Sequence, residues 1–126
     1  MLKTVSFYGT CAAGSELVLV SDVIGHPYLV KAIRCSFPVG SINKVELQFF
    51  IAEDDDPPST GLPNGLSILA DYGHVPYVVG EGEVVKMLHE VEVRIANTWL
   101  KVHANNRDFA EHAVNVQITI DIEDRG

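Results

Sequence analysis

The chain has 126 residues, of which 47% are hydrophobic, so it is long enough for one folded core and too short for two ordinary domains. Its net charge of −8 repels phosphate groups, and its nine lysines and arginines are scattered singly, which argues against binding to nucleic acids and to anionic membranes. We therefore expect a single folded domain over residues 1–126, and no disordered chain.

The start of the chain, Met1–Val5, lacks the apolar region of a secretion signal, and no apolar run approaches the roughly 20 residues of a membrane-spanning helix. We expect synthesis in the cytoplasm, followed by retention there or by exit through lysis or a route without a cleaved signal. Cys11 and Cys35 are too few for a disulfide framework. They are expected to be small buried residues, although a bridge between them stays open.

Short apolar runs, separated by Gly, Pro, Asn and Asp, predict strands along the whole chain. The predicted strands lie near Val5–Tyr8, Glu16–Val20, Tyr28–Phe37, Asn43–Ala52, Tyr77–Val79, Val84–Leu88, Val91–Ala96, Thr98–Ala104 and Ala113–Glu123. The links between them are too short for crossover helices, so the pairing should be antiparallel. The predicted fold is an all-β, jelly-roll-like antiparallel sandwich of about eight strands, with at most one short helix, at Leu66–Gly73, where a short strand is the alternative.

The last predicted strand carries the clearest pattern. Between Ala113 and Asp124, Val and Ile alternate with polar residues at almost every position, as in Ile118 and Thr119. Strict alternation is typical of a strand with one buried and one solvated face. It predicts an antiparallel sheet that packs on a second layer.

Two pairings between strands follow from the same alternation. A hairpin around Ala96 and Asn97, with a loop of two residues or of four around a type I turn, places hydrophobic residues opposite one another on the buried face. On the other face Arg94 meets Trp99, and Glu92 meets Lys101. The register of this hairpin pairs Arg94 with Trp99, Val93 with Leu100, Glu92 with Lys101, Val91 with Val102 and Glu90 with His103. The strands Tyr28–Phe37 and Asn43–Ala52 are expected to be consecutive neighbours across the loop that begins at Pro38.

No motif predicts catalysis. The acids of Glu53–Asp56 are consecutive and do not follow the alternating pattern of an EF-hand, so we interpret them as a solvated loop in preference to a Ca²⁺ site. The five histidines form no His-x-His or His-Glu-x-x-His pattern, and the chain has no nucleophile elbow and no phosphate-binding loop. We expect no enzyme activity, no metal and no cofactor.

Two aromatic residues are expected on outer faces. Leu100 and Val102 should lie in the core, which places Trp99 on the opposite face, and Phe50 lies on the polar face of its own strand. Three interpretations of Trp99 are open: partial cover against Arg94, a contact with a subunit or partner, or a platform for stacking sugars.

The acidic and proline-rich loop Asp54–Pro63, followed by the strands of Val91–Glu123, resembles the jelly-roll decoration (cement) proteins of tailed-phage virions. The resemblance covers most of the chain in style and includes no diagnostic motif. It implies a mechanical role, in which a homo-oligomer, a trimer or another symmetric cluster, caps the major capsid protein or another virion protein. The implied location is the virion. The chain departs from that pattern because no capsid-binding arm is identified beyond Met1–Thr4.

The first hypothesis is therefore a structural protein that stabilises a shell through its interfaces. The expected interface residues are Phe50, Trp99, Lys101, His103, Asp55, Pro57, Pro58, Leu62 and Tyr72. The second is a carbohydrate-binding module in which Trp99 or Tyr72 stacks on a sugar and the acidic loop binds hydroxyl groups or Ca²⁺. The third is a small metal-dependent enzyme that uses His89, His103 or His112.

Overall fold

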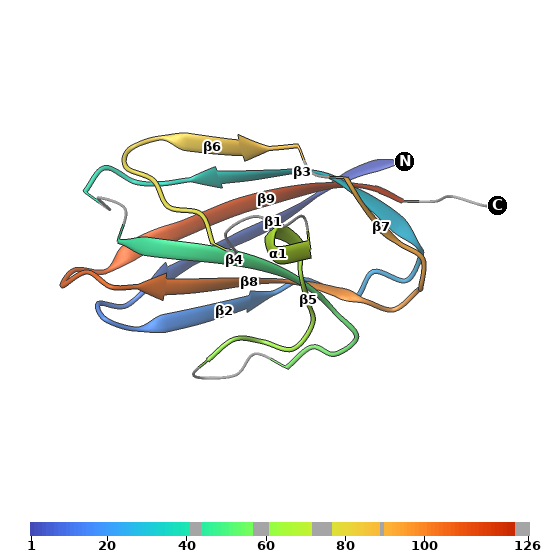
Figure 1. Cartoon of the computed structure of the whole chain (residues 1–126), viewed down its shortest axis with the longest axis horizontal. Helices are drawn as coiled ribbons and strands as arrows, with labels where there is room; N and C mark the ends of the chain where they lie inside the picture. The colour runs from blue at the N-terminus through green and yellow to red at the C-terminus, as the bar shows by residue number, and fades with distance from the viewer. Residues whose placement is uncertain (41–43, 57–60, 72–76, 89, 123–126) are drawn as a thin grey trace.

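A computed structural model describes residues 1–40, 44–56, 61–71, 77–88 and 90–122. Over these residues the chain forms two antiparallel sheets packed face to face (Figure 1). The predicted antiparallel sandwich is confirmed. The described residues contain nine strands and one four-residue helix, against about eight strands expected.

The first sheet, sheet A, is built around the C-terminal strand. Its strands are β1 (Leu2–Cys11), β9 (His112–Ile122), β3 (Tyr28–Ser36) and β6 (Val84–Met87) in that spatial order, and β7 (Val91–Val93) also pairs with β3. All ten residues of β1 pair with β9, so the start of the chain is hydrogen-bonded to its last strand.

The second sheet, sheet B, has the order β2 (Glu16–Val20), β8 (Trp99–Asn106), β4 (Val45–Ala52) and β5 (Leu66–Ser67). The helix α1 (Ile68–Asp71) follows β5 directly. The segment Leu66–Gly73, for which a short helix or a short strand was expected, thus begins with a strand and continues as a helix. The segment Tyr77–Val79 is not a full strand, because only Val78 bridges to Leu47 of β4.

The core lies between the two sheets and confirms the alternation in β9. The residues of β9 alternate between buried and partly exposed, and Ile118 is fully buried while Thr119 faces outward. Phe49 of β4 and Leu100 of β8 meet this face from sheet B, and neither is exposed to solvent. Burial of this apolar face is the dominant favourable term in folding.

The predicted hairpin at Ala96 and Asn97 is wrong. Strand β7 pairs with β3 in sheet A, whereas β8 pairs with β2 and β4 in sheet B, so the chain crosses between sheets here. The backbone N–H of Asn97, which has a positive φ of 62°, donates to the carbonyl of Ile24 at 2.9 Å. Val93 and Leu100 are both buried, but they reach the core from opposite sides. Two strands that pair in one hairpin and two strands that face each other across the sandwich show the same alternation of inward-facing residues. The sequence pattern therefore could not distinguish a hairpin from a crossing between the sheets.

The expected pairing of β3 with β4 is also wrong. The two strands are consecutive in the chain but lie in different sheets, and β3 pairs with β9, β6 and β7. The link at Pro38 therefore also crosses the sandwich, as in Greek-key connections.

Candidate functional site

The outer face of sheet B is covered by the described parts of segment 53–65, which we call the covering loop. The side chain of Lys101, which is not exposed at all, bonds to the carboxylate of Asp54 and donates to the backbone carbonyl of Asp56 at 3.0 Å. The Asn64 amide donates to the same carboxylate at 3.0 Å. The Lys101 ammonium and then this amide hold the pKa of Asp54 below its usual range.

A second contact fastens the same loop to β2 and β8. One oxygen of Glu16 lies 2.9 Å from Nε2 of His103, and the other accepts a hydrogen bond of 3.1 Å from the backbone N–H of Gly61. The Gly61 N–H and then His103 lower the pKa of Glu16. The acidic loop is therefore partly built into the fold through Asp54, where full solvation was expected.

The expected interface residues are divided between buried and exposed positions. Phe50, Lys101 and His103 share the outer face of sheet B with Trp99, but the first three are at most 4% exposed and Trp99 is partly buried. Asp55 and Leu62 are exposed, whereas Pro57, Pro58 and Tyr72 lie outside the described residues. The structure thus does not present this set as one open patch within the described chain, and its role at an interface stays a prediction.

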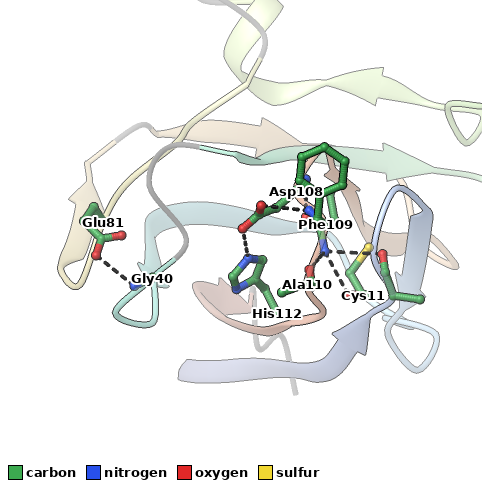
Figure 2. A network of polar contacts seen from close by, with 9 residues as sticks. Cys11, Gly40, Glu81, Asp108, Phe109, Ala110 and His112 are labelled. Atoms are coloured by element: carbon green, nitrogen blue, oxygen red, sulfur yellow. Dashed lines mark hydrogen bonds and ion pairs between the residues drawn. The ribbon is translucent and has the colours of Figure 1, made fainter.

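A different site is organised by Asn106, the fully buried last residue of β8. Its side-chain amide donates to the backbone carbonyls of Cys11 at 3.1 Å, Ala12 at 3.3 Å and Ala110 at 2.8 Å. Its oxygen accepts a hydrogen bond of 2.9 Å from the backbone N–H of Asp108. One buried side chain therefore holds the β8–β9 loop against the end of β1, and Figure 2 labels Cys11 and Ala110, two of the residues whose carbonyls it reaches.

The carboxylate of Asp108 fixes the other half of the loop. It lies 2.7 Å from Nε2 of His112 and accepts a hydrogen bond of 2.7 Å from the backbone N–H of Phe109 (Figure 2). These two contacts, His112 first, lower the pKa of Asp108. The Asp108 carbonyl accepts from the N–H of Gly14 at 3.0 Å. At the centre of this network the Phe109 side chain is completely exposed, with a relative exposure of 101%.

Sequence reasoning missed this site. The signal was present in Asn105, Asn106 and Asp108, three turn-forming residues that follow the predicted strand Thr98–Ala104, with a large aromatic residue directly after them. A phenylalanine in such a turn has no strand position that would bury it. Its full exposure on a fixed loop is the kind of feature that marks a contact site.

A pocket of about 620 Å³ lies at the far end of β9 from Phe109, and we call it the end pocket. Its apolar lining consists of Pro27, Tyr28, Leu29, Val93 and Ile122. Charged side chains complete it, namely Glu92, Arg94 and Asp121. The pocket brings together the beginning of β3, the end of β9 and the short strand β7.

The outer face of sheet A is a polar surface with one exposed aromatic ring, Tyr8, which is 73% exposed. Its neighbour in register on β9 is Asn115. The next row across the sheet consists of Ser6, Gln117, Arg34 and Lys86. Hydroxyl, amide and guanidinium groups thus lie beside a flat ring.

A metal site was the other chemistry considered from the sequence. The described residues contain no group of three or more His, Cys, Asp or Glu that could hold a metal. Cys11 and Cys35 are both buried and free, as expected, and burial raises the pKa of the Cys35 thiol to about 12. His89 lies outside the described residues. No helix in the described chain is long and apolar enough to cross a membrane.

No protein-family model and no curated protein match this sequence. Among solved structures, the chain is similar to chitosan-binding module 1 of a chitosanase/glucanase from Paenibacillus sp. IK-5, with a TM-score of 0.53 and 11% identity over 88% of this chain and 74% of that one. It is also similar to a chain in the structure of broad bean stain virus, with a TM-score of 0.52 and 5% identity over 99% and 87%. These likenesses confirm the jelly-roll type of fold.

Proposed function

We propose that this protein is a non-enzymatic structural subunit of a virion, which stabilises a shell through contacts with copies of itself and with a capsid protein. The observation that carries the proposal is Phe109, a completely exposed aromatic ring on a loop fixed by Asn106 and Asp108. Binding energy in protein interfaces is concentrated in a few such anchors, and a loop that is already ordered loses little entropy when it binds.

The fold supports the same proposal. The likeness to a chain in the structure of broad bean stain virus covers nearly the whole of this protein, which supports a place for such a sandwich in a virion. The hydrogen bonds of Asn106 and Asp108 order the loop that presents the exposed ring of Phe109. This site therefore supports a role in contacts with another protein.

The solution mass tests this function first. Light scattering across a concentration series should show a stable trimer or another closed oligomer, and electron microscopy of concentrated samples should show particles of uniform size. A monomer at every concentration would refute self-assembly. Trp99→Ala tests the interface predicted from sequence, and an unchanged oligomer with unchanged capsid binding would remove Trp99 from it.

The outer face of sheet A favours a second candidate function, carbohydrate binding. The exposed ring of Tyr8 and the polar row that contains Gln117 and Arg34 match the chemistry of a sugar, which has apolar faces and many hydroxyl groups. The chitosan-binding module shows that this kind of sandwich serves that purpose elsewhere. A glycan array should then give signals that Tyr8→Ala abolishes and Trp99→Ala retains. Silence of the wild-type protein across the array would reject this function.

A further inference from the structure

We propose that the outer face of sheet A binds carbohydrates that carry a carboxylate group. Tyr8 stacks on a sugar ring, and Arg34 and Lys86 bind the carboxylate. The inference rests on carbohydrate binding, the second candidate function above, and names the class of sugar that this face takes. Two cations without partners, the polar groups beside them and one exposed ring carry it.

Arg34 of β3 and Lys86 of β6 are paired directly in register, and both residues are exposed. Residues opposite one another in an antiparallel pair place their Cβ atoms about 5 Å apart on the same face, so two like charges there repel each other. Neither side chain forms an ion pair or a hydrogen bond within the described chain. A bound anion would therefore relieve a repulsion that the fold itself does not compensate.

The acids at the β7 end of sheet A do not neutralise these cations. Asp121 lies four residues from Gln117, the neighbour of Arg34 on β9, and this separation is roughly 13 Å along a strand. Its carboxylate already accepts a hydrogen bond of 2.8 Å from the N-terminal amine. Two further acids at this end have ion pairs of their own, Glu92 with Arg94 and Glu90 with Lys31.

The acids at the other end of the sheet are also distant or engaged. Glu111 precedes β9 and lies six residues from Gln117, roughly 20 Å along an extended chain. The carboxylate of Glu83, before β6, accepts a hydrogen bond of 3.2 Å from the backbone N–H of Glu81. Among the described residues, the surroundings of the cation pair therefore keep a positive charge, although the chain as a whole carries −8.

Protection of the sheet edge does not account for both cations. Strand β6 ends the order of sheet A, and lysines on edge strands discourage pairing with other chains, which explains Lys86. Arg34 lies on β3, which pairs with β9 on one side and with β6 on the other. A guanidinium on an inner strand protects no edge, so its position beside a second cation points to a ligand.

The groups in the same row fit an acidic sugar. The planar fork of Arg34 matches the two oxygens of a carboxylate, and Lys86 adds a second positive charge. Gln117 and Ser6 continue this row across β9 and β1, and Asn115 lies in the next row. Amide and hydroxyl groups both donate and accept hydrogen bonds, as the hydroxyl groups of a sugar require.

The ring of Tyr8 lies within reach of the same ligand. Tyr8 is two strands and one outward-facing row away from Arg34, a separation of roughly 12 Å between their backbones. Figure 1 shows β1, β9 and β3 next to one another across this sheet. A short oligosaccharide can therefore stack on the ring and reach the cations. The net charge of −8 repels long polyanions, which favours a ligand with few carboxylates among many hydroxyls.

A glycan array that holds oligogalacturonates, oligoalginates, and sialylated, sulfated and neutral oligosaccharides identifies the class. Carboxylated glycans should give the strongest signals. Isothermal titration calorimetry then compares the uronic-acid oligosaccharide that binds most tightly with its methyl ester, which keeps the sugar rings and removes the charge. The ester should bind roughly fivefold or more weakly, and the affinity for the acid should fall as salt is raised.

Four variants assign the binding to this face. Arg34→Gln and Lys86→Gln should each weaken binding of the acid roughly fivefold or more and should leave binding of the ester unchanged. Tyr8→Ala should weaken both. Arg94→Gln removes the same charge from a side chain that is 81% exposed at the β7 end of the sheet, and this matched control should bind like the wild type. Circular dichroism checks that each variant is folded.

The possible failures are distinct. Binding of neutral glycans that Tyr8→Ala removes and Arg34→Gln preserves would overturn the preference for carboxylates and leave carbohydrate binding standing. A preference for sulfated over carboxylated glycans would overturn the class of sugar. An equal loss in Arg94→Gln would show a general effect of charge and overturn the assignment to Arg34 and Lys86. Silence of the wild-type protein across the array would overturn both this inference and the carbohydrate function.

Discussion

The side-chain amide of Asn106 donates a hydrogen bond of 2.8 Å to the backbone carbonyl of Ala110, four residues further along the chain. The bond closes the loop that carries Phe109, and the same amide also reaches the carbonyl of Cys11 on β1. One residue thereby connects β8, the β8–β9 loop and the edge of sheet A. This connection explains how a completely exposed phenylalanine is held in a defined position.

The first prediction concerns Asn106 itself. Asn106→Ala removes the side-chain partner of the Asp108 N–H and of the Ala110 and Cys11 carbonyls. Each hydrogen bond of this kind contributes about 1 kcal/mol, with a larger penalty of about 1–3 kcal/mol where a buried group is left unsatisfied. Urea denaturation should show a loss of a few kcal/mol in the free energy of unfolding. Asn115→Ala, on the partly exposed face of β9, is the control and should cost much less. Equal losses would contradict the central role of Asn106.

The second prediction tests the two faces of β9. Ile118→Ala should lower the free energy of unfolding by about 2–5 kcal/mol, because Ile118 is fully buried and its loss creates a cavity. Thr119→Ala should cost far less, since this neighbour faces outward. Chemical denaturation of both variants is the measurement. Similar losses would show that both faces are packed.

The third prediction concerns the buried cation beneath the covering loop. Asp54→Asn should destabilise the protein, because it leaves Lys101, which is fully buried, without its carboxylate partner. Asp55→Asn changes an exposed neighbour and serves as the control. Lys101→Met should suppress most of the loss caused by Asp54→Asn, because no buried charge is then left uncompensated. Melting temperatures of the single and double variants measure this coupling, and additive losses would argue against it.

The fourth prediction is an acid-sensitive fold. The pKa values of Glu16, Asp54 and Asp108 are lowered in the folded chain, so the unfolded chain binds more protons in acid. Their contribution is complete above the ordinary carboxyl pKa of about 4 and is lost as the pH falls through the lower folded values. The contribution of these three carboxylates to the free energy of unfolding should therefore be nearly constant from pH 7 to about pH 5. Below about pH 5 the free energy of unfolding should decrease.

Asp108→Asn provides the internal control for this pH dependence. The amide cannot titrate, so the variant should be less stable at pH 7 and should lose less stability than the wild type between pH 5 and pH 3. Urea denaturation at these pH values compares the two chains. A parallel decline in both would assign the acid sensitivity to other carboxylates.

Local patterns predicted most of the strands and failed on their pairing. Strand β2 has the predicted bounds, and the alternation of β9 correctly identified its inward-facing residues. The hairpin between β7 and β8 was predicted from matching faces, yet Val93 and Leu100 belong to different sheets. In a sandwich both sheets turn their apolar faces to one core, so facing residues look alike in sequence whether they pair or pack.

The same distinction separates what sequence and tertiary structure decided about the sites. Composition and alternation were sufficient for an all-β sandwich with a buried face on β9, because burial of apolar residues depends on the local pattern along each strand. The cover over Lys101 and His103, the loop held by Asn106 and the end pocket join residues far apart in the chain. Only the tertiary structure could reveal them, because a hydrogen bond or a cavity depends on distances that no local pattern encodes.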